Sequence, residues 1–429
     1  MKRLFAQFMV EWRSNLWLVV ELVIVSAVLW FVIDHMNLSL SIKFEPDGWN
    51  TTNTFRIVVK SISQDSPNFV APELLPGEDE NTAFHKMLRA NHDELMRRLR
   101  AVEGVEAVTL ASFHPHCYNF WGRGFNLKAE PGDTADIQST FGINFIEVYG
   151  DYAQVYDLHG LNGETPQDID RSLADGMFVI TGNVFVPSGI KGETLKNRPA
   201  YPTGAPEEER KIGAAIPVFK RAQYEKAQFG TAIVTEPKLT QRSEIEMGVR
   251  VDPEKAATFI HDLRNNHPEL AQIGNIYIST ITSAEDVAAS LNRSYEITLR
   301  SLTLGIAFLL MTIFLGLLGT FWFRTQQRVS EIAIRMVNGA TQGSIFARLI
   351  SEGLIMLLLS IPFSAALVWT MIHYELVETL WYYPSTIWTR ATIEYAGVIS
   401  LMALTIIAGI SIPARKAVKV QPVDVLRGE

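Results

Sequence analysis

Three side chains that commonly bind metals lie close together in the sequence His114-Pro115-His116-Cys117. Histidine nitrogens and cysteine thiolates are the usual ligands of zinc, and a structural zinc site needs four of them. The spacing here fits no standard zinc pattern, and no second pair of ligands follows to complete the set. Pro115 favours a loop at the surface. We therefore expect no metal site in this chain.

No motif in the chain predicts catalysis. The phosphate-binding sequence G-x-x-x-x-G-K-[ST] does not occur, so the chain itself is not expected to bind ATP. No Ser/His/Asp arrangement and no pair of carboxylates stands out either. We expect a chain that is not an enzyme, with no catalytic residue and no cofactor of its own.

The segment RVSEIAIRMVNGAT (residues 328–341) has the pattern of a short amphipathic helix between two long apolar stretches. Glu331 and Arg335 are four residues apart, with the acid before the base, as in an ion pair on the polar face. Ile334 is an apolar exception on that face. Gly339 can form the left-handed turn that ends a helix, and Thr341 can cap the next one. A connector kept amphipathic only by the membrane interface would show the same periodicity. The apolar stripe contains Val329, Ile332, Ala333, Met336 and Val337.

Four long apolar stretches predict four transmembrane helices. Each has about the 17 to 25 residues that a helix needs to cross the hydrocarbon core. The first is longer than the apolar part of a signal peptide and no clear cleavage site follows it, so we expect it to remain as a span. The predicted spans are residues 14–33, 301–323, 349–373 and 394–412.

Basic residues flank these spans unevenly, which predicts their orientation. Lysine and arginine are concentrated before the first span, between the second and third, and after the fourth. The loop between the third and fourth spans has only Arg390 against Glu375 and Glu378. We therefore expect both termini and the middle loop in the cytoplasm, and a large domain outside.

The composition is typical of a chain divided between lipid and water. Of 429 residues, 48% are hydrophobic, and 38 basic residues against 46 acidic ones give a net charge of −8. Because the cytoplasmic segments are basic, the external domain must be acidic, which argues against nucleic-acid binding. The single cysteine, Cys117, excludes a disulfide within the chain. The external domain must therefore be stabilised by its own core.

The external domain has the pattern of an α+β structure. A strand-helix-strand order occurs near its start and again near its end, where Asp-Pro opens the second helix. Two such units flanking a longer insert predict one lobe built from both ends of the domain and a second, inserted lobe. The expected strands and helices cover residues 55–60, 92–101, 105–113, 247–251, 252–265 and 275–281.

A helix that begins after Ser283 is expected to run directly into the second span. Ser283 and Asp286 form a capping-box pattern, and no helix breaker follows before residue 300. Such a helix would tie the external domain rigidly to the membrane. Besides the four spans, the expected parts are a cytoplasmic amphipathic segment (1–13), the external domain (34–297) with a lobe from about 50–114 and 241–282, an inserted lobe at about 115–240 and a stalk helix at about 283–300, a cytoplasmic loop (324–348), a short external loop (374–393) and a cytoplasmic tail (413–429).

Three features inside the spans have both a functional and a structural interpretation. Glu21 is an ionisable residue in a span, which often marks a functional site, but it lies near the cytoplasmic edge, where water is within reach. Pro362 would bend the third span, as a hinge or as a tolerated kink. Thr312, Gly316 and Thr320 recur every fourth residue and allow close packing of helices, between two chains or within one. A similar row on the fourth span contains Ala396, Ser400 and Ala408.

Two stretches resemble one family of membrane proteins. EIAIRMVNGAT (331–341) is similar to the E-I-A-I-R-x-x-x-G-A-T segment of the MacB/FtsX-like permeases of ABC transporters. PARKAVKVQPVDVLRGE (413–429) is similar to the P-A-R-x-A-x-x-x-x-P-x-x-x-L-R ending of that family. The order of four spans, with a large domain after the first, also matches. Met336-Val337-Asn338 departs from the family, which often has a basic residue and Ala-Leu there.

The resemblance implies an α-helical membrane protein with four transmembrane helices and a two-lobed α+β periplasmic core domain between helices 1 and 2. It also implies that the 324–348 loop carries a coupling helix, which receives movement from an ATP-binding subunit in a mechanotransmission (type VII) system. The implied ATPase-coupling residues are Arg328, Glu331, Ile334, Arg335 and Gly339, and the possible dimer-packing residues are Thr312, Gly316 and Thr320.

We therefore expect a permease subunit in the bacterial inner membrane. It would couple ATP hydrolysis by a separate subunit, which binds ATP and Mg²⁺, to movements of its periplasmic domain, for efflux or extrusion of a periplasmic or lipid-linked substrate. The expected partners are a P-loop ATPase, a second permease copy or paralogue, a membrane-fusion protein or another periplasmic protein, and membrane lipid. Two alternatives remain: an FtsX-like signalling subunit that regulates a periplasmic hydrolase, and a membrane-anchored sensor without an ATPase.

Overall fold

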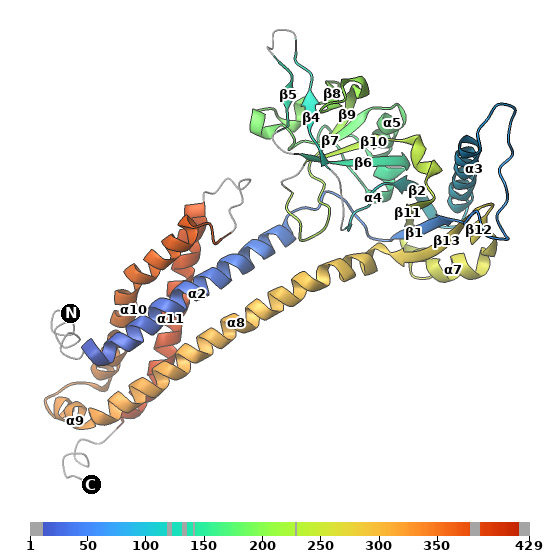
Figure 1. The fold of residues 1–429 in the computed structure, drawn as a ribbon. Helices are drawn as coiled ribbons and strands as arrows, with labels where there is room; N and C mark the ends of the chain where they lie inside the picture. The colour runs from blue at the N-terminus through green and yellow to red at the C-terminus, as the bar shows by residue number, and fades with distance from the viewer. Residues whose placement is uncertain are drawn as a thin grey trace. The chain divides into compact units, whose positions relative to one another are not determined.

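The computed structural model describes residues 12–117, 122–130, 135–139, 142–227, 230–377 and 387–419. The chain forms two compact units (Figure 1). We call Met1–Ser41 with Glu296–Glu429 the helical unit, and Ile42–Tyr295 the sheet unit. The predicted N-terminal amphipathic segment up to residue 11, Glu378 and the C-terminal residues from 420 onward lie outside the described residues.

Four helices of the described chain are long and apolar enough to cross a membrane, one at each of the four predicted spans. Each extends beyond the apolar window that predicted it, because helix propagation needs good helix formers but not apolar ones. A fifth, short helix joins the second and third. These helices are α2 (Trp12–Phe44), α8 (Ala284–Gln327), α9 (Val329–Val337), α10 (Gln342–His373) and α11 (Ile387–Ala417).

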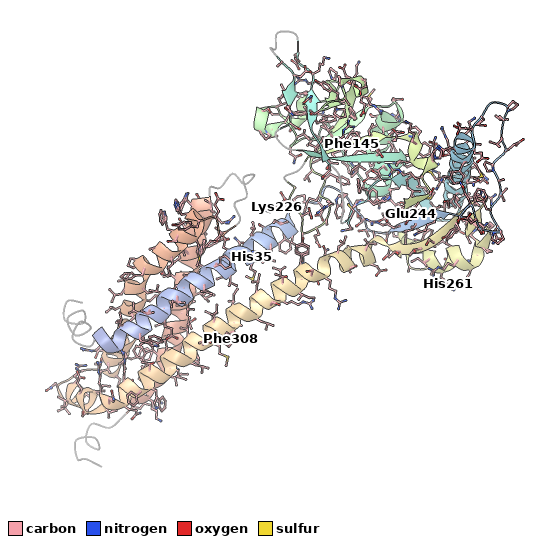
Figure 2. The ribbon with its side chains drawn as sticks, viewed as in Figure 1. His35, Phe145, Lys226, Glu244, His261 and Phe308 are labelled. Atoms are coloured by element: carbon pink, nitrogen blue, oxygen red, sulfur yellow. The ribbon has the colours of Figure 1, made fainter. Side chains whose placement is uncertain are left out.

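The helical unit has an apolar surface as well as an apolar core. Trp30, Phe321 and Met402 are among the side chains that pack in its interior. On α8, however, Leu304 and Phe308 are 71% and 69% exposed. Figure 2 labels Phe308 on this helix. An apolar surface of this kind is unfavourable in water and stable in lipid. The helices therefore indicate a membrane protein.

Pro362 lies inside α10 and removes one backbone hydrogen bond from that helix. Tyr395 of α11 packs beside it. The Tyr395 hydroxyl donates to the Ile361 carbonyl at 3.0 Å and lies 2.6 Å from the hydroxyl of Ser364. Because α11 holds α10 on both sides of the proline, this geometry favours a tolerated kink over a free hinge.

The sheet unit contains the predicted pair of strand-helix-strand arrangements. Strand β1 pairs with β11 and β13, and β11 pairs with β2, all antiparallel. The resulting order, β13-β1-β11-β2, is that of a ferredoxin-like βαββαβ fold. Its elements are β1 (Thr54–Ser61), α3 (Glu80–Arg100), β2 (Val105–Ala111), β11 (Glu244–Val251), α6 (Pro253–Ala256), α7 (Phe259–Asn266), η5 (Pro268–Leu270), β12 (Gln272–Ile273) and β13 (Ile276–Ser283).

Two predicted helix boundaries in this region are wrong. Helix α3 begins at Glu80 and not at residue 92, because Asp79 caps it by accepting a hydrogen bond from the Thr82 amide at 2.9 Å. The predicted helix over 252–265 is divided into α6 and α7, although Asp252 does cap the first of them.

The inserted segment continues the same sheet. Strand β6 pairs antiparallel with β2 and parallel with β10, so the sheet is mixed and joins the two predicted lobes. The described strands run in the order β12-β13-β1-β11-β2-β6-β10-β7-β9-β8-β4-β5, with β3 against β6. The inserted elements are β3 (Gly122–Arg123), β4 (Phe125–Leu127), β5 (Ile137–Gln138), β6 (Ile143–Gly150), α4 (Tyr152–Tyr156), α5 (Pro166–Ala174), β7 (Phe178–Thr181), η1 (Val186–Ser188), η2 (Gly192–Thr194), β8 (Pro199–Pro202), η3 (Pro206–Glu208), β9 (Arg210–Ile216), β10 (Thr231–Thr235) and η4 (Pro237–Gln241).

Strand β2 separates two cores, because side chains alternate between the faces of a strand. Val108 and Leu110 belong to the core that contains α3 and α7, while Ala107 and Ala111 belong to the core that contains α4. A third core lies among the remaining inserted strands. One sheet thus supports several separate hydrophobic clusters.

Helix α8 begins in the sheet unit and continues without interruption into the helical unit. The Ser283 hydroxyl accepts a hydrogen bond from the Asp286 amide at 3.1 Å and lies 2.7 Å from the Asp286 carboxylate. The predicted cap at Ser283 and the continuous helix after it are therefore confirmed, although Asp286 binds the Ser283 hydroxyl and completes only half of a capping box.

Candidate functional site

Helix α9 connects α8 to α10 and carries most of the residues that the sequence singled out. Ile332 and Ala333 are buried, and Ile332 packs in one cluster with Ile345 and Leu349 of α10. Met336 is partly buried against the same cluster. These contacts fix one face of α9 to the helical unit.

Ion pairs lie along a second face of α9, and one of them joins the start of α9 to α10. Arg328, directly before α9, and Arg348 of α10 lie 3.4 Å and 3.6 Å from the two carboxylate oxygens of Glu352. Glu331 and Arg335 form the predicted ion pair along the helix. All five side chains line one small pocket. Glu331 and Arg335 are therefore engaged within the chain, and their side chains are only 40% and 34% exposed.

A third face of α9 is exposed and largely apolar. Ile334 and Val337 are 51% and 64% exposed, and Ser330 between their positions on the helix is exposed as well. Val337 belongs to the predicted apolar stripe but is exposed, unlike Ile332 and Ala333. At 100° per residue, Val337 lies at the edge of that stripe, beside Ser330 and Ile334. The exposed face is thus formed by Ser330, Ile334 and Val337, of which the sequence predicted Ile334.

The turn after α9 has the predicted geometry. Gly339 has a φ of +91°, in the left-handed region that favours glycine. The Gly339 and Ala340 amides donate to the carbonyls of Met336 and Arg335, both at 3.0 Å, which is a Schellman motif. Thr341 then caps α10 by accepting from the Ser344 amide. The left-handed turn and the new cap are both confirmed.

The three small residues of the second span do not share one free surface. A Cβ atom added to Gly316 would lie 3.3 Å from a carboxylate oxygen of Glu21, so Gly316 packs against α2 of the same chain. Thr312 is exposed, and its hydroxyl donates to the Phe308 carbonyl at 2.9 Å. Gly316 and Glu21 therefore take part in packing within the chain, while a dimer role for Thr312 and Thr320 stays a prediction. On α11, Ala396, Ser400 and Ala408 are exposed.

The prediction that His114, Pro115 and His116 form a surface loop is wrong. His114 and His116 are 2% and 5% exposed and lie around Arg56, which donates to the Pro115 and His116 carbonyls and pairs with Glu246 at 3.4 Å. Both nitrogens of His114 are hydrogen-bonded, one to the Tyr156 hydroxyl and one to the Glu246 carbonyl. Among the described residues, no three metal-ligating side chains converge.

Burial controls the ionisation of this cluster. Desolvation, with a contribution from the Arg56 charge, lowers the pKa of His114 to about 3 and that of His116 to about 4. Desolvation also raises the pKa of the Cys117 thiol to about 11. The imidazoles are therefore neutral and the thiol is protonated near neutral pH, which suits a structural role and not a reactive one.

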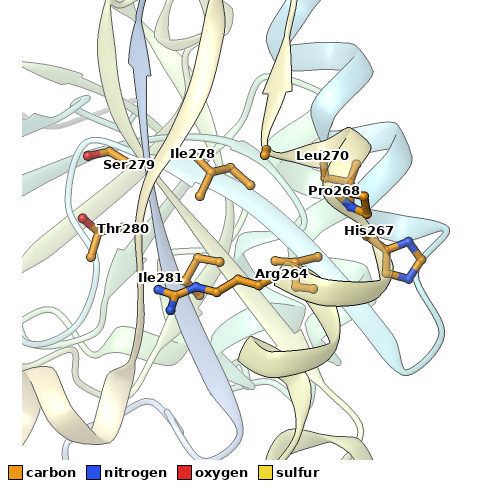
Figure 3. Close-up of a pocket in the computed structure, with 10 residues that line it drawn as sticks. Arg264, His267, Pro268, Leu270, Ile278, Ser279, Thr280 and Ile281 are labelled. Atoms are coloured by element: carbon orange, nitrogen blue, oxygen red, sulfur yellow. The ribbon is translucent and has the colours of Figure 1, made fainter.

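A pocket of about 130 Å³ lies between α7, η5 and β13 in the sheet unit (Figure 3). Leu263, Leu270 and Ile281 supply its apolar lining, and Arg264 extends along it towards Ile281 (Figure 3). His267 at its rim is paired with Glu269 at 3.1 Å. None of the residues predicted to be functional lines this pocket.

The sequence analysis did not predict a cluster of polar groups around Lys220 in the sheet unit. We call this cluster the polar junction. The Lys220 side chain is fully buried, and its ammonium group donates to the carbonyls of Ile42, Glu45 and Gln223 at 2.9 to 3.2 Å. Asp47 lies 2.8 Å from the same nitrogen. The junction therefore ties the end of α2 to an inserted loop that is distant in sequence.

The same loop also contacts the beginning of α8. The Asn292 amide donates to the Gln223 side chain at 3.1 Å, and the rings of Tyr224 and Tyr295 stack with centroids 5.1 Å apart. We call residues 219–225 the junction loop. Within the sheet unit, this loop holds the ends of both helices that continue into the helical unit.

No known family model matches this chain, and no curated protein is significantly similar to it. Its function has to be inferred from the residues themselves.

Proposed function

We propose that the chain is the membrane permease subunit of an ABC transporter of the MacB/FtsX type, with α9 as its coupling helix. A separate P-loop ATPase binds ATP and Mg²⁺ on the cytoplasmic side of the bacterial inner membrane and moves α9. Helix α8 carries that movement to the sheet unit in the periplasm, where it drives the efflux or extrusion of a periplasmic or lipid-linked substrate.

The exposed apolar face of α9 is the observation that carries this proposal. Ile334 and Val337 are exposed on a helix that is held to α10 by the buried Ile332 and by the ion pair of Arg328 with Glu352. An apolar helix face inserted into a groove of a partner is a common mode of protein recognition. A helix held rigidly by its own chain would pass the movement of that partner on, instead of absorbing it.

The connections of the sheet unit support transmission by two helices. Helix α8 is uninterrupted over 44 residues. Its first turns contact the junction loop through Asn292 and Tyr295. The end of α2 contacts the same loop through the carbonyls of Ile42 and Glu45, which accept from Lys220. A force that reaches either helix would therefore act on the inserted part of the sheet.

Site-specific photo-crosslinking in living cells tests the coupling role. A photoreactive amino acid at position 334 or 337 should capture a protein that contains the G-x-x-x-x-G-K-[ST] sequence, identified by mass spectrometry. Position 70 is the matched control, because Val70 is an exposed apolar residue of the sheet unit, 62% exposed. The proposal fails if positions 334 and 337 capture no such ATPase.

Substitution provides a second arm of the test. Ile334→Asp and Val337→Asp should abolish the Mg-ATP hydrolysis that accompanies the purified complex, while Val70→Asp should leave it unchanged. A charge-swapped pair, Glu331→Arg with Arg335→Glu, should have a smaller effect because both side chains are engaged within the chain. Unchanged hydrolysis in Ile334→Asp would mean that the exposed face of α9 does not couple to the ATPase, and would overturn the proposed role of this helix.

A further inference from the structure

A cluster of buried charged side chains joins α2 to α11 inside the helical unit. Arg390 of α11 holds Asp34 of α2 at two points, Nε to Oδ1 at 2.9 Å and Nη2 to Oδ2 at 3.3 Å. One helical turn further along α11, Glu394 accepts a hydrogen bond from the Asn37 amide at 2.6 Å. Asp34 and Glu394 are only 2% and 8% exposed. Two carboxyl groups and one guanidinium thus meet away from solvent.

One oxygen of this cluster is left without a hydrogen-bond donor. Glu394 Oε1 is satisfied by Asn37, but Oε2 is buried and has no partner. The acidic group beside it is Asp34, which as a carboxylate can only accept hydrogen bonds. If both acids were ionised, Oε2 would face another acceptor in an apolar environment, an arrangement that is strongly unfavourable.

The charge balance points the same way. Among the described residues, the charged groups that interact with Glu394 are Asp34 from α2 and Arg390 from α11, and Asn37 is neutral. Arg390 already holds both oxygens of Asp34. One guanidinium compensates one carboxylate, so the second acid is neutral only if it carries a proton.

We infer that the cluster of Asp34, Asn37, Arg390 and Glu394 is a proton-binding site. Glu394 carries a proton at neutral pH and donates a hydrogen bond to Asp34 through its otherwise unpartnered oxygen. The proton replaces repulsion between the two acids by a hydrogen bond from α11 to α2. Ionisable groups inside candidate spans commonly have such functional roles.

The bound proton stabilises the contact between α2 and α11 at low pH, and this stabilisation is lost as the pH rises. Below the pH at which Glu394 ionises, the hydrogen bond is present and the helices are joined. As the pH rises and the proton is lost, a second negative charge appears beside Asp34 and the contact weakens. This site does not depend on an ATPase partner, so its test is separate from that of the coupling role of α9.

Infrared spectroscopy of the full chain in lipid nanodiscs detects the proton directly. Wild type should show the carbonyl stretching band of a buried carboxylic acid, and Glu394→Gln should lose it. The matched control is Glu296→Gln, because Glu296 is an exposed glutamate of α8 whose side chain is 47% exposed. A spectrum in which Glu394→Gln removes no carboxylic acid band would overturn the inference.

The stability of the full chain gives an independent readout. Glutamine has the shape of protonated glutamate and can keep both hydrogen bonds, so Glu394→Gln should fold and match the unfolding temperature of wild type in mild acid. In alkaline buffer, the unfolding temperature of wild type should fall, whereas that of Glu394→Gln should not. If the unfolding temperatures of wild type and Glu394→Gln changed with pH in the same way, the proposal would be contradicted. A wild-type stability that depends on Na⁺ or K⁺, compared with choline, would also contradict it, since a cation would then occupy the site.

Discussion

The sheet unit and the helical unit bury charge in different ways. In the sheet unit, Lys220 is surrounded by three carbonyls and by Asp47, so its positive charge is fully compensated. In the helical unit, Glu394 keeps a buried oxygen without a donor. A compensated charge acts as a fixed structural element, whereas an under-compensated acid responds to protons. The buried charge of the sheet unit is therefore held in a fixed arrangement, whereas the buried acid of the helical unit can change its protonation state.

The two units also differ in the solvent that they require. The sheet unit packs its buried apolar side chains in clusters around one mixed sheet. Helix α8 of the helical unit leaves large apolar side chains such as Leu304 and Phe308 exposed. Water therefore suits the first surface and lipid the second. Four substitutions test how far this contrast holds.

Lys220→Met should cause the largest loss of stability. It removes the cation from three carbonyls and from Asp47, and breaking a buried ion pair by removing one partner costs about 3–5 kcal/mol. Hydrogen exchange of β6 and β10 in the full chain measures the loss within the sheet unit. Lys211→Met is the control, because Lys211 is exposed on β9. Equal effects of the two substitutions would mean that the junction is not a rigid element.

Acid should weaken the sheet unit through its buried histidines. The pKa values of His114 and His116 are lowered to about 3 and about 4, from 6.5 in the unfolded chain. Below pH 6.5 the unfolded chain therefore binds more protons, and stability falls as the pH drops towards these lower values. Each histidine contributes a slope of about 1.4 kcal/mol per pH unit in that window.

His116→Asn isolates one of these contributions. His116 has a φ of +63°, which asparagine tolerates, so the backbone should be retained. The slope of stability against pH, measured by hydrogen exchange of β2 and β11, should fall by about 1.4 kcal/mol per pH unit. His159→Asn, at a side chain that is 63% exposed, is the control for replacing a histidine at the surface. A slope that is the same in both variants would show that His116 takes up protons in the folded state.

Gly339→Ala should have a moderate effect in the helical unit. Alanine at a φ of +91° is strained by about 1–2 kcal/mol. Gly343→Ala is the matched control, since Gly343 lies in α10 with no atom near its would-be Cβ and should gain about 0.5–1 kcal/mol. The readout is hydrogen exchange of α9 in nanodiscs. Faster exchange in both variants, or in neither, would contradict the assigned turn.

Glu331→Gln should have the smallest effect. An ion pair four residues apart on a partly exposed helix contributes about 0.3–0.5 kcal/mol. Glu352→Gln should cost more, because Glu352 is 19% exposed and holds both Arg328 and Arg348. Thermal unfolding of the two variants side by side checks this order. The reverse order would mean that the Glu331–Arg335 pair within α9 stabilises this helix more than the contact of Arg328 with Glu352 of α10 does.

Several elements could be predicted because they depend on interactions between residues that are close in the sequence. Apolar windows of membrane-spanning length became α2, α8, α10 and α11. The cap at Ser283, the left-handed Gly339 and the cap at Thr341 all occur where their residue types predicted them. These features depend on hydropathy and on hydrogen bonds between residues a few positions apart, which a sequence displays directly.

The tertiary structure decided what surrounds each polar group. The sequence determined that His114, Lys220, Asp34 and Glu394 are present, but their partners lie far along the chain: Glu246 for His114, Ile42 for Lys220, and Arg390 for Asp34. It also determined an amphipathic α9, while only the packing of α10 showed that Glu331 and Arg335 are half-buried and that Val337 is exposed. Helical and strand periodicity is local, whereas desolvation and charge compensation depend on neighbours that folding alone brings together.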